Sequence, residues 1–162
     1  MSAAEPADII LSLSVTTAAE TQALAAALAR HCRSGDCLLL RGELGSGKTT
    51  FARGFIQALC PGEEVVSPTF TLVQTYPGSQ APIWHFDLYR LKHPGELAEI
   101  GLQEALATGI ALIEWPELAQ SQLPGDALGI TIESGPGPEQ RLLTFAGRKS
   151  VWQSRLEAMK GE

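Results

Sequence analysis

Apolar positions recur with different spacings along the chain, and these spacings predict strands in some segments and helices in others. Residues 9–15 (IILSLSV) alternate apolar and polar positions, which favours a half-buried strand. Residues 17–32 open with Thr-Ala-Ala-Glu, the spacing of a capping box, and predict an Ala-rich helix. Residues 37–40 (CLLL) predict a buried strand, whereas residues 48–59 have the periodicity of an amphipathic helix.

The second half of the chain predicts more strands, with one helix among them. Residues 70–76 and 83–89 are strand-like, and the loop between them is too short to hold a helix, so they should be antiparallel neighbours. Residues 94–106 predict a helix interrupted at Gly101, and residues 110–114 (IALIE) predict a buried strand. Two late strands and a terminal helix complete the chain, at 127–133, 140–146 and 148–160.

Length and composition fit one domain. The chain has 162 residues, of which 44% are apolar and 19% charged, and no linker or repeat divides it. We therefore predict an α/β fold formed by a single domain over residues 1–162, with a mixed parallel and antiparallel sheet flanked by helices. The apolar runs are only a handful of residues long, so no membrane association is expected.

Cysteine content and charge limit the compartment and the partners. Cys32, Cys37 and Cys60 form no CxxC pair, and the N-terminal segment lacks a secretion signal, so we expect free thiols and a cytoplasmic location. The net charge is −6, from 12 basic and 18 acidic residues. Because autonomous nucleic-acid binding usually requires a basic surface, strong binding of RNA by this chain alone is not expected.

The segment GELGSGKT matches the phosphate-loop motif G-x-x-x-x-G-K-[ST] in full, and it lies between a predicted strand and a predicted helix. Its glycines let backbone N–H groups surround an anion, and the following helix directs its positive end to the same point. The lysine would contact the β and γ phosphates, and the threonine hydroxyl would ligate Mg²⁺. We predict ATP and Mg²⁺ as ligands, with nucleotide-binding residues Gly42, Glu43, Leu44, Gly45, Ser46, Gly47, Lys48, Thr49 and Thr50.

A P-loop ATPase also needs a carboxylate at the end of a neighbouring strand to hold the metal. Glu114 ends the run IALI and Asp87 lies in IWHFDLYR, so both are candidates. Period-two alternation places His85, Asp87 and Tyr89 on one face of their strand and the apolar residues on the other, which favours an active-site face. Whether His85 is functional or only a structural hydrogen-bond partner is left open.

Other P-loop classes fit less well. A GTPase would carry Asn-Lys-x-Asp, but the chain contains no asparagine, and no LSGGQ-like segment of an ABC-type ATPase is present. A small P-loop kinase that phosphorylates a small molecule or nucleotide stays possible, although no Arg-rich lid is evident. A module in which ATP only sets a conformation is a third alternative.

Four segments together resemble one family. GELGSGKTTFARGFIQAL, SPTFTLVQTY, HFDLYRL and IEWPEL, in this order, closely resemble the bacterial TsaE (YjeE) family, the ATPase of tRNA threonylcarbamoyladenosine biosynthesis. The likeness covers about residues 17–118 and is weaker beyond. It implies a small P-loop fold with a mixed sheet, Mg²⁺-dependent ATP hydrolysis that is weak alone, and association with TsaD and TsaB. Those proteins modify the adenosine next to the tRNA anticodon, so contact with tRNA would be indirect.

The resemblance also implies residue roles. Lys48 and Asp87 would be catalytic, and Thr49 and Glu114 would be the metal ligands. Which of Asp87 and Glu114 positions the attacking water is left open. Thr17 would lie near the adenine. A switch segment that responds to the γ phosphate would comprise Ser67, Pro68 and Thr69. Two residues depart mildly from the family pattern, Glu43 in place of Asp and Phe70 in place of Tyr. For Trp115, packing over the core and contact with a partner or the switch segment are both open.

Overall fold

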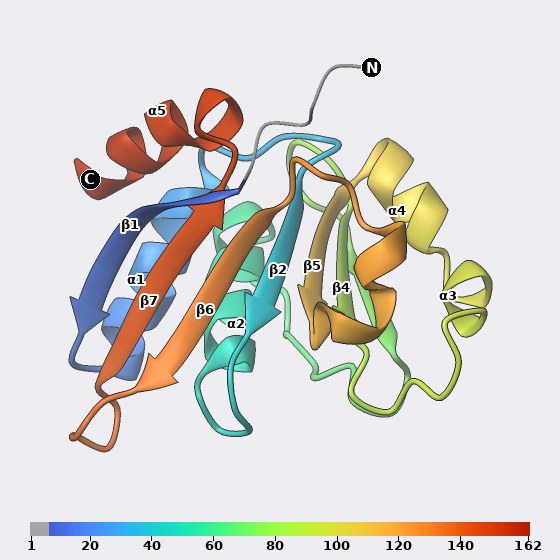
Figure 1. Ribbon diagram of the computed structural model, residues 1–162, viewed down its shortest axis with the longest axis horizontal. Helices are drawn as coiled ribbons and strands as arrows, with labels where there is room; N and C mark the ends of the chain where they lie inside the picture. The colour runs from blue at the N-terminus through green and yellow to red at the C-terminus, as the bar shows by residue number, and fades with distance from the viewer. Residues whose placement is uncertain (1–6) are drawn as a thin grey trace.

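The computed structural model describes residues 7–162 (Figure 1). One sheet of seven strands, in the order β1-β7-β6-β2-β5-β4-β3, forms the centre of the molecule. Strands β6, β2, β5 and β4 are parallel neighbours, whereas β7 pairs antiparallel with both β1 and β6, and β3 pairs antiparallel with β4. The predicted mixed sheet, including the antiparallel pairing of β3 with β4, is therefore confirmed.

The strands follow the predicted order along the sequence. Their bounds are β1 Asp8–Val15, β2 Cys37–Arg41, β3 Val73–Tyr76, β4 Ile83–Asp87, β5 Ile110–Glu114, β6 Leu128–Ser134 and β7 Arg141–Gly147. The helices are α1 Ala18–Ala29, α2 Lys48–Leu59, α3 Glu96–Glu99, α4 Leu102–Thr108 and α5 Lys149–Lys160. A 3₁₀ helix at Pro116–Gln122 was not predicted. None of the helices formed by residues 7–162 has the length and apolar character that crossing a membrane requires.

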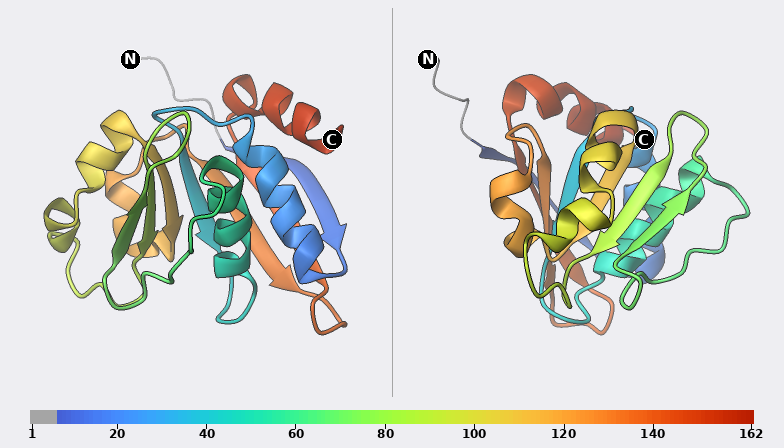
Figure 2. Two further views of the ribbon diagram at one scale, coloured as in Figure 1. Left: turned by 180° about the vertical axis from the view of Figure 1, so that it is seen from behind. Right: turned by 90° about the vertical axis from the view of Figure 1, so that its right-hand side faces the viewer.

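The sheet separates two apolar cores because side chains alternate between its faces. Leu38 and Leu40 of β2 belong to the larger core beneath α1, α2 and α5, whereas Cys37 and Leu39 belong to the smaller core beneath α3, α4 and the 3₁₀ helix. Figure 2 shows α1 and α2 side by side on one face of the sheet. Both faces of β2 and β5 are thus covered, which explains their continuous apolar sequences.

Two predicted strands are shorter than expected, for local reasons. Residues 70–72 form a turn instead of the start of β3, because Leu72 adopts a left-handed conformation (φ 69°) and its N–H donates to the carbonyl of Pro68 at 2.7 Å. Strand β4 ends at Asp87 instead of Tyr89, since the Asp87 carboxylate accepts the N–H of Tyr89 at 3.0 Å and turns the backbone.

The predicted helices also differ at their ends. The predicted break at Gly101 is confirmed, because this residue has φ +85° and separates α3 from α4. Helix α1 ends at Ala29, three residues before the predicted end, in tight turns made by the N–H groups of residues 31 and 32. At its start, Thr17 Oγ1 accepts the N–H of Glu20 at 3.1 Å, while the Glu20 carboxylate accepts the N–H of Thr16, not that of Thr17. The Thr17 cap is therefore confirmed, and only the reciprocal bond of the capping box is shifted, by one residue.

Candidate functional site

The phosphate-loop segment joins the central strand β2 to α2, at the carboxyl end of the strand. Gly42, Gly45 and Gly47 all have positive φ, at 152°, 78° and 109°. A Cβ on Gly42 would lie 2.5 Å from the carbonyl oxygen of Ile132, so the close approach of β6 also requires glycine. Gly47 caps α2 without a side-chain hydrogen bond, which leaves the N–H groups of the first turn available to an anion.

Lys48 is folded over this loop and is only 4% exposed. Its Nζ donates to the carbonyls of Gly42 at 2.6 Å and Glu43 at 3.0 Å, and it lies 4.0 Å from the centre of the Trp115 ring. Burial lowers the pKa of Lys48, and the negative charge of Glu114 opposes this effect. The ammonium group therefore lies between the loop carbonyls and the aromatic ring of Trp115.

Two carboxylates face the start of α2 from neighbouring strands. Asp87 ends β4, Glu114 ends β5, and the two residues are paired in the parallel register. The hydroxyl of Thr49 lies 3.2 and 3.3 Å from the two carboxylate oxygens of Glu114. Burial raises the pKa of Asp87, the charge of Glu114 adds to this effect, and hydrogen bonds from Tyr89 and Thr69 oppose it.

The predicted switch residues lie beside these carboxylates to different degrees. The Thr69 hydroxyl donates to Asp87 Oδ2 at 3.3 Å, and Ser67 contacts Thr69 through their hydroxyls at 2.8 Å. Pro68 contributes only its carbonyl to the turn described above. Phe70 is 83% exposed and packs under the guanidinium of Arg90. Thr69 thus touches the candidate site directly, and Ser67 reaches it through Thr69.

A cavity of about 290 Å³ brings most of these groups together. Its lining residues are Leu44, Gly45, Gly47, Lys48, Thr49, Thr50, Thr69, Asp87, Glu114, Trp115 and Arg141. A neighbouring cavity of about 230 Å³ lies past Gly47 and Thr50, against Ala18 and Thr21 of α1 and the loop before β7. Thr17 does not line this second cavity, since its hydroxyl caps α1, but the next residue does.

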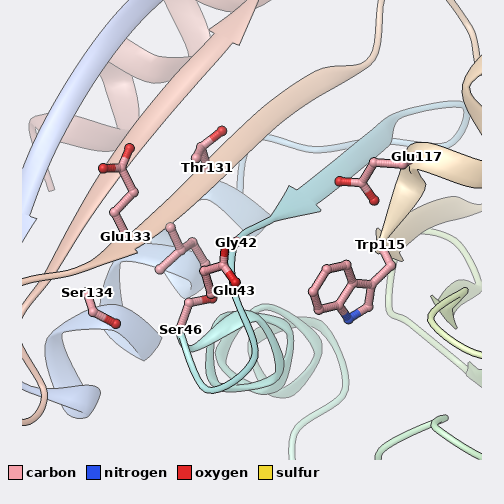
Figure 3. A pocket seen from close by; sticks show the side chains of 9 residues that line it. Gly42, Glu43, Ser46, Trp115, Glu117, Thr131, Glu133 and Ser134 are labelled. Atoms are coloured by element: carbon pink, nitrogen blue, oxygen red, sulfur yellow. The ribbon is translucent and has the colours of Figure 1, made fainter.

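A larger cavity of about 540 Å³ lies against Gly42, Glu43 and Ser46 of the phosphate loop, with Trp115 at its edge (Figure 3). It also has the carboxylates of Glu117 and Glu133 in its lining. Among residues 7–162, no lysine or arginine lines this larger cavity. The 290 Å³ cavity also contains carboxylates, those of Asp87 and Glu114, but Lys48 and Arg141 supply positive charge there, so it is the better candidate for a phosphate site.

Sequence reasoning missed Arg141, on β7. Its Nε donates to the carbonyl of Ser46 at 2.6 Å, and its Nη2 lies 3.3 Å from the carbonyl of Gly45. The guanidinium therefore holds the phosphate loop and adds a second positive charge to the cavity. No spacing rule signals it, because Arg141 is separated from Ser46 by 95 residues.

The oxygen donors suit a hard cation such as Mg²⁺. The Thr49 hydroxyl and the Glu114 carboxylate point at each other beside the loop, and Mg²⁺ in phosphate sites usually takes one or two protein ligands and completes its shell with phosphate and water. Within residues 7–162, at the candidate site or elsewhere, no group of three or more His, Cys, Asp or Glu side chains is arranged to hold a metal ion. The donor set fits Mg²⁺ held together with a nucleotide.

A complete phosphate-loop motif joins a central parallel strand to a helix, and acidic residues end β5, which is next to that strand, and β4, which is next to β5. This arrangement defines a P-loop α/β protein. The family model described as "Threonylcarbamoyl adenosine biosynthesis protein TsaE" matches residues 15–142. The chain belongs to the TsaE family.

Individual relatives agree with this assignment. The "tRNA threonylcarbamoyladenosine biosynthesis protein TsaE" of Bacillus subtilis is 40% identical over 141 residues, which cover 86% of this chain and 87% of that protein. The protein of the same name from Rickettsia conorii is 44% identical over 71% of this chain and 66% of its own length. The crystal structure of Bacillus subtilis YdiB superimposes with a TM-score of 0.77 at 30% identity, covering 99% of this chain and 98% of that one.

Proposed function

We propose that this chain binds ATP with Mg²⁺ and hydrolyses it as a subunit of the assembly that forms threonylcarbamoyladenosine in tRNA. The observation that carries the proposal is the convergence of Thr49, Glu114 and Asp87 beside the phosphate loop. Family membership directs this chemistry to tRNA modification. TsaD and TsaB are the proposed partners, the cytoplasm is the proposed location, and tRNA is reached through the complex.

Binding follows from the loop and the helix. The N–H groups at the start of α2 and the loop backbone bind the phosphates, and the cavity next to Thr50 takes the nucleoside. Lys48 exchanges its bonds to the Gly42 and Glu43 carbonyls for the phosphate oxygens. Arg141 steadies the loop carbonyls and adds positive charge.

Hydrolysis depends on the two carboxylates. Glu114 and Thr49 would hold Mg²⁺, which when bound neutralises charge on the β and γ phosphate oxygens. Asp87 orients a water molecule toward the γ phosphate, and Thr69, whose hydroxyl donates to Asp87, links that carboxylate to the switch segment. Trp115 covers the Lys48 ammonium and limits its contact with water.

ATP labelled in its γ phosphate tests the proposal directly. We expect label to appear as free phosphate slowly with the chain alone, and at a changed rate when TsaD, TsaB and tRNA are added. The Lys48→Ala variant should lose this activity. Label transferred to a small-molecule or nucleotide acceptor would favour the kinase alternative and contradict the proposal.

The Asp87→Ala variant distinguishes the proposed hydrolase from the third alternative, a module in which ATP sets only a conformation. Because a water-positioning group matters in the transition state and little in the ground state, this variant should bind ATP normally and lose hydrolysis about 100-fold or more. Its complex should then fail to sustain repeated rounds of tRNA modification. A variant complex that turns over normally would instead support the conformational module.

A further inference from the structure

His85 touches the proposed metal carboxylate from within the sheet. Its Nε2 lies 2.6 Å from Glu114 Oε2, and both side chains are buried, at 0% and 3% exposure. The same carboxylate faces the hydroxyl of Thr49. The Glu114 carboxylate therefore lies between His85 Nε2 and the hydroxyl of Thr49, the other proposed metal ligand.

The sheet register explains this contact. Asp87 pairs with Glu114 across β4 and β5, and His85 lies two residues before Asp87, so all three side chains project from the same face. His85 is thereby directed to Glu114 diagonally across the strand pair. Its place in the strand gives it this contact without bringing it into the lining of the phosphate cavity.

The other ring nitrogen bears on the direction of the hydrogen bond. Nδ1 of His85 is buried and has no hydrogen-bond partner among residues 7–162. A hydrogen on Nδ1 would be a buried donor without an acceptor, which is costly, whereas a bare nitrogen there costs less. A carboxylate oxygen accepts, so the 2.6 Å contact is a hydrogen bond that the Nε2–H of His85 donates to Glu114 Oε2, and the bare Nδ1 agrees with this direction.

We propose that His85 is a positioning residue that holds Glu114 Oε2, sets the orientation of the carboxylate beside Thr49, and so keeps Oε1 available to the cation. This inference rests on the proposed function, because it assumes that Thr49 and Glu114 hold Mg²⁺. A purely structural histidine would stabilise the fold without changing how strongly Mg²⁺ aids nucleotide binding. The two roles therefore differ in a measurable quantity.

That quantity is the increase in ATP affinity that Mg²⁺ causes, which we call the Mg²⁺-dependent gain. It is the ATP dissociation constant in EDTA divided by that in Mg²⁺, and calorimetry measures both. His85→Phe keeps a ring and removes the donor, and the gain should fall about 10- to 100-fold, as when a partner that orients a metal ligand is lost. The affinity in EDTA should stay near that of the wild type. His85→Gln carries an amide N–H that reaches about as far as Nε2 and should restore most of the gain.

The chain supplies a matched control. His31 contacts Glu162 through Nε2 at the same distance of 2.6 Å, in a partly exposed pair outside the candidate site. His31→Phe makes the same substitution at a histidine–glutamate pair and should leave the gain unchanged. Circular dichroism and thermal unfolding establish that each variant is folded.

The outcomes separate the inference from the proposed function. A wild-type gain that His85→Phe retains in full would overturn the positioning role and leave the proposed metal site standing. A wild type that binds ATP equally in Mg²⁺ and EDTA would overturn both. If His85→Phe does not fold, His85→Asn takes its place, because its shorter amide does not reach Glu114, and a retained gain in that variant likewise overturns the inference.

Discussion

The role of Glu114 can be inferred only from the residues that surround it. At the end of an apolar strand it could be a solvated terminus, but it is only 2% exposed and faces Thr49. A buried carboxylate is costly unless its oxygens are paired, and here a hydroxyl and an imidazole satisfy them. Burial and pairing of this kind fit the proposed role, in which a cation would replace the direct contact between the Thr49 hydroxyl and the Glu114 carboxylate.

Removal of this carboxylate should act through the cation. In Glu114→Ala we expect ATP affinity in Mg²⁺ to fall by 10-fold or more, while affinity in EDTA changes little, because metal-free nucleotide is held by the loop. Titration calorimetry in the two buffers measures both values. Equal losses in the two buffers would assign Glu114 a structural role.

The raised pKa of Asp87 predicts a pH-dependent cost to stability. A carboxyl group whose pKa is higher in the folded chain than its unfolded value of about 3.9 binds more protons when folded, so stability falls as pH rises between the two values. In Asp87→Asn, the side-chain oxygen still accepts the hydrogen bond from the N–H of Tyr89, but the negative charge is removed. The variant should therefore unfold in higher urea than the wild type at pH 7, and this advantage should vanish near pH 3. An unchanged difference across this range would contradict the burial argument.

The sequence predicted those helices and strands in which a single apolar periodicity dominates. It predicted less well the element ends that side-chain or backbone contacts determine. Periodicity predicted β2, α2 and β5, because burial on one or both faces leaves a clear apolar pattern. The exact end of β4 could not be read from residues 83–89, since it depends on the Asp87 side chain bonding its own backbone. The helical turns after Trp115 follow from a left-handed residue at φ 57°, which tryptophan rarely adopts.

Close contact between α1 and α2 depends on Gly54. A Cβ at this position would lie 2.5 Å from the carbonyl oxygen of Gln22 and 2.6 Å from its Cα, and backbone atoms cannot rotate away. Gly54→Ala should destabilise the fold by about 1–2 kcal/mol, because overpacking of about 1–3 kcal/mol exceeds a helix-propensity gain of up to about 1 kcal/mol. Urea unfolding measures the change.

Gly161 provides the control for this substitution. It has φ −77°, and an added Cβ would approach no atom closer than 3.6 Å. Gly161→Ala should therefore stay within about 0.5 kcal/mol of the wild type. If Gly54→Ala proves equally neutral, the two helices must be able to separate without cost.

At the scale of the whole molecule, the candidate site assembles from segments that are distant in sequence: the phosphate loop with the start of α2, and the strands β4, β5 and β7. The phosphate loop was predictable because its residues are contiguous, and Asp87 and Glu114 because each ends an apolar strand. Arg141 was not, since only the order of strands in the sheet carries β7 to the loop. The pairing of His85 with Glu114 likewise depends on register, which the sequence does not encode locally.

The burial of the three cysteines in the two apolar cores predicts how fast their thiols react with reagents. Cys32, Cys37 and Cys60 are buried free thiols, and burial raises the pKa of Cys37 to about 12 and also raises those of the other two. Reaction requires both access and a thiolate, so a disulfide reagent at pH 8 should modify the native protein slowly, with Cys60 first because it is the most exposed, at 6%. All three should react at once in denaturant.

ATP with Mg²⁺ should slow this reaction further, because a ligand that binds only the folded chain lowers the population of open states. A stopped-flow or absorbance record of thiol release, with and without nucleotide, measures the effect. The Lys48→Ala variant is the control, since it should lose most of the protection while keeping the same core. Rapid modification of Cys32 or Cys37 in the native protein would mean that the sheet opens locally, and the nucleotide would then leave those rates unchanged.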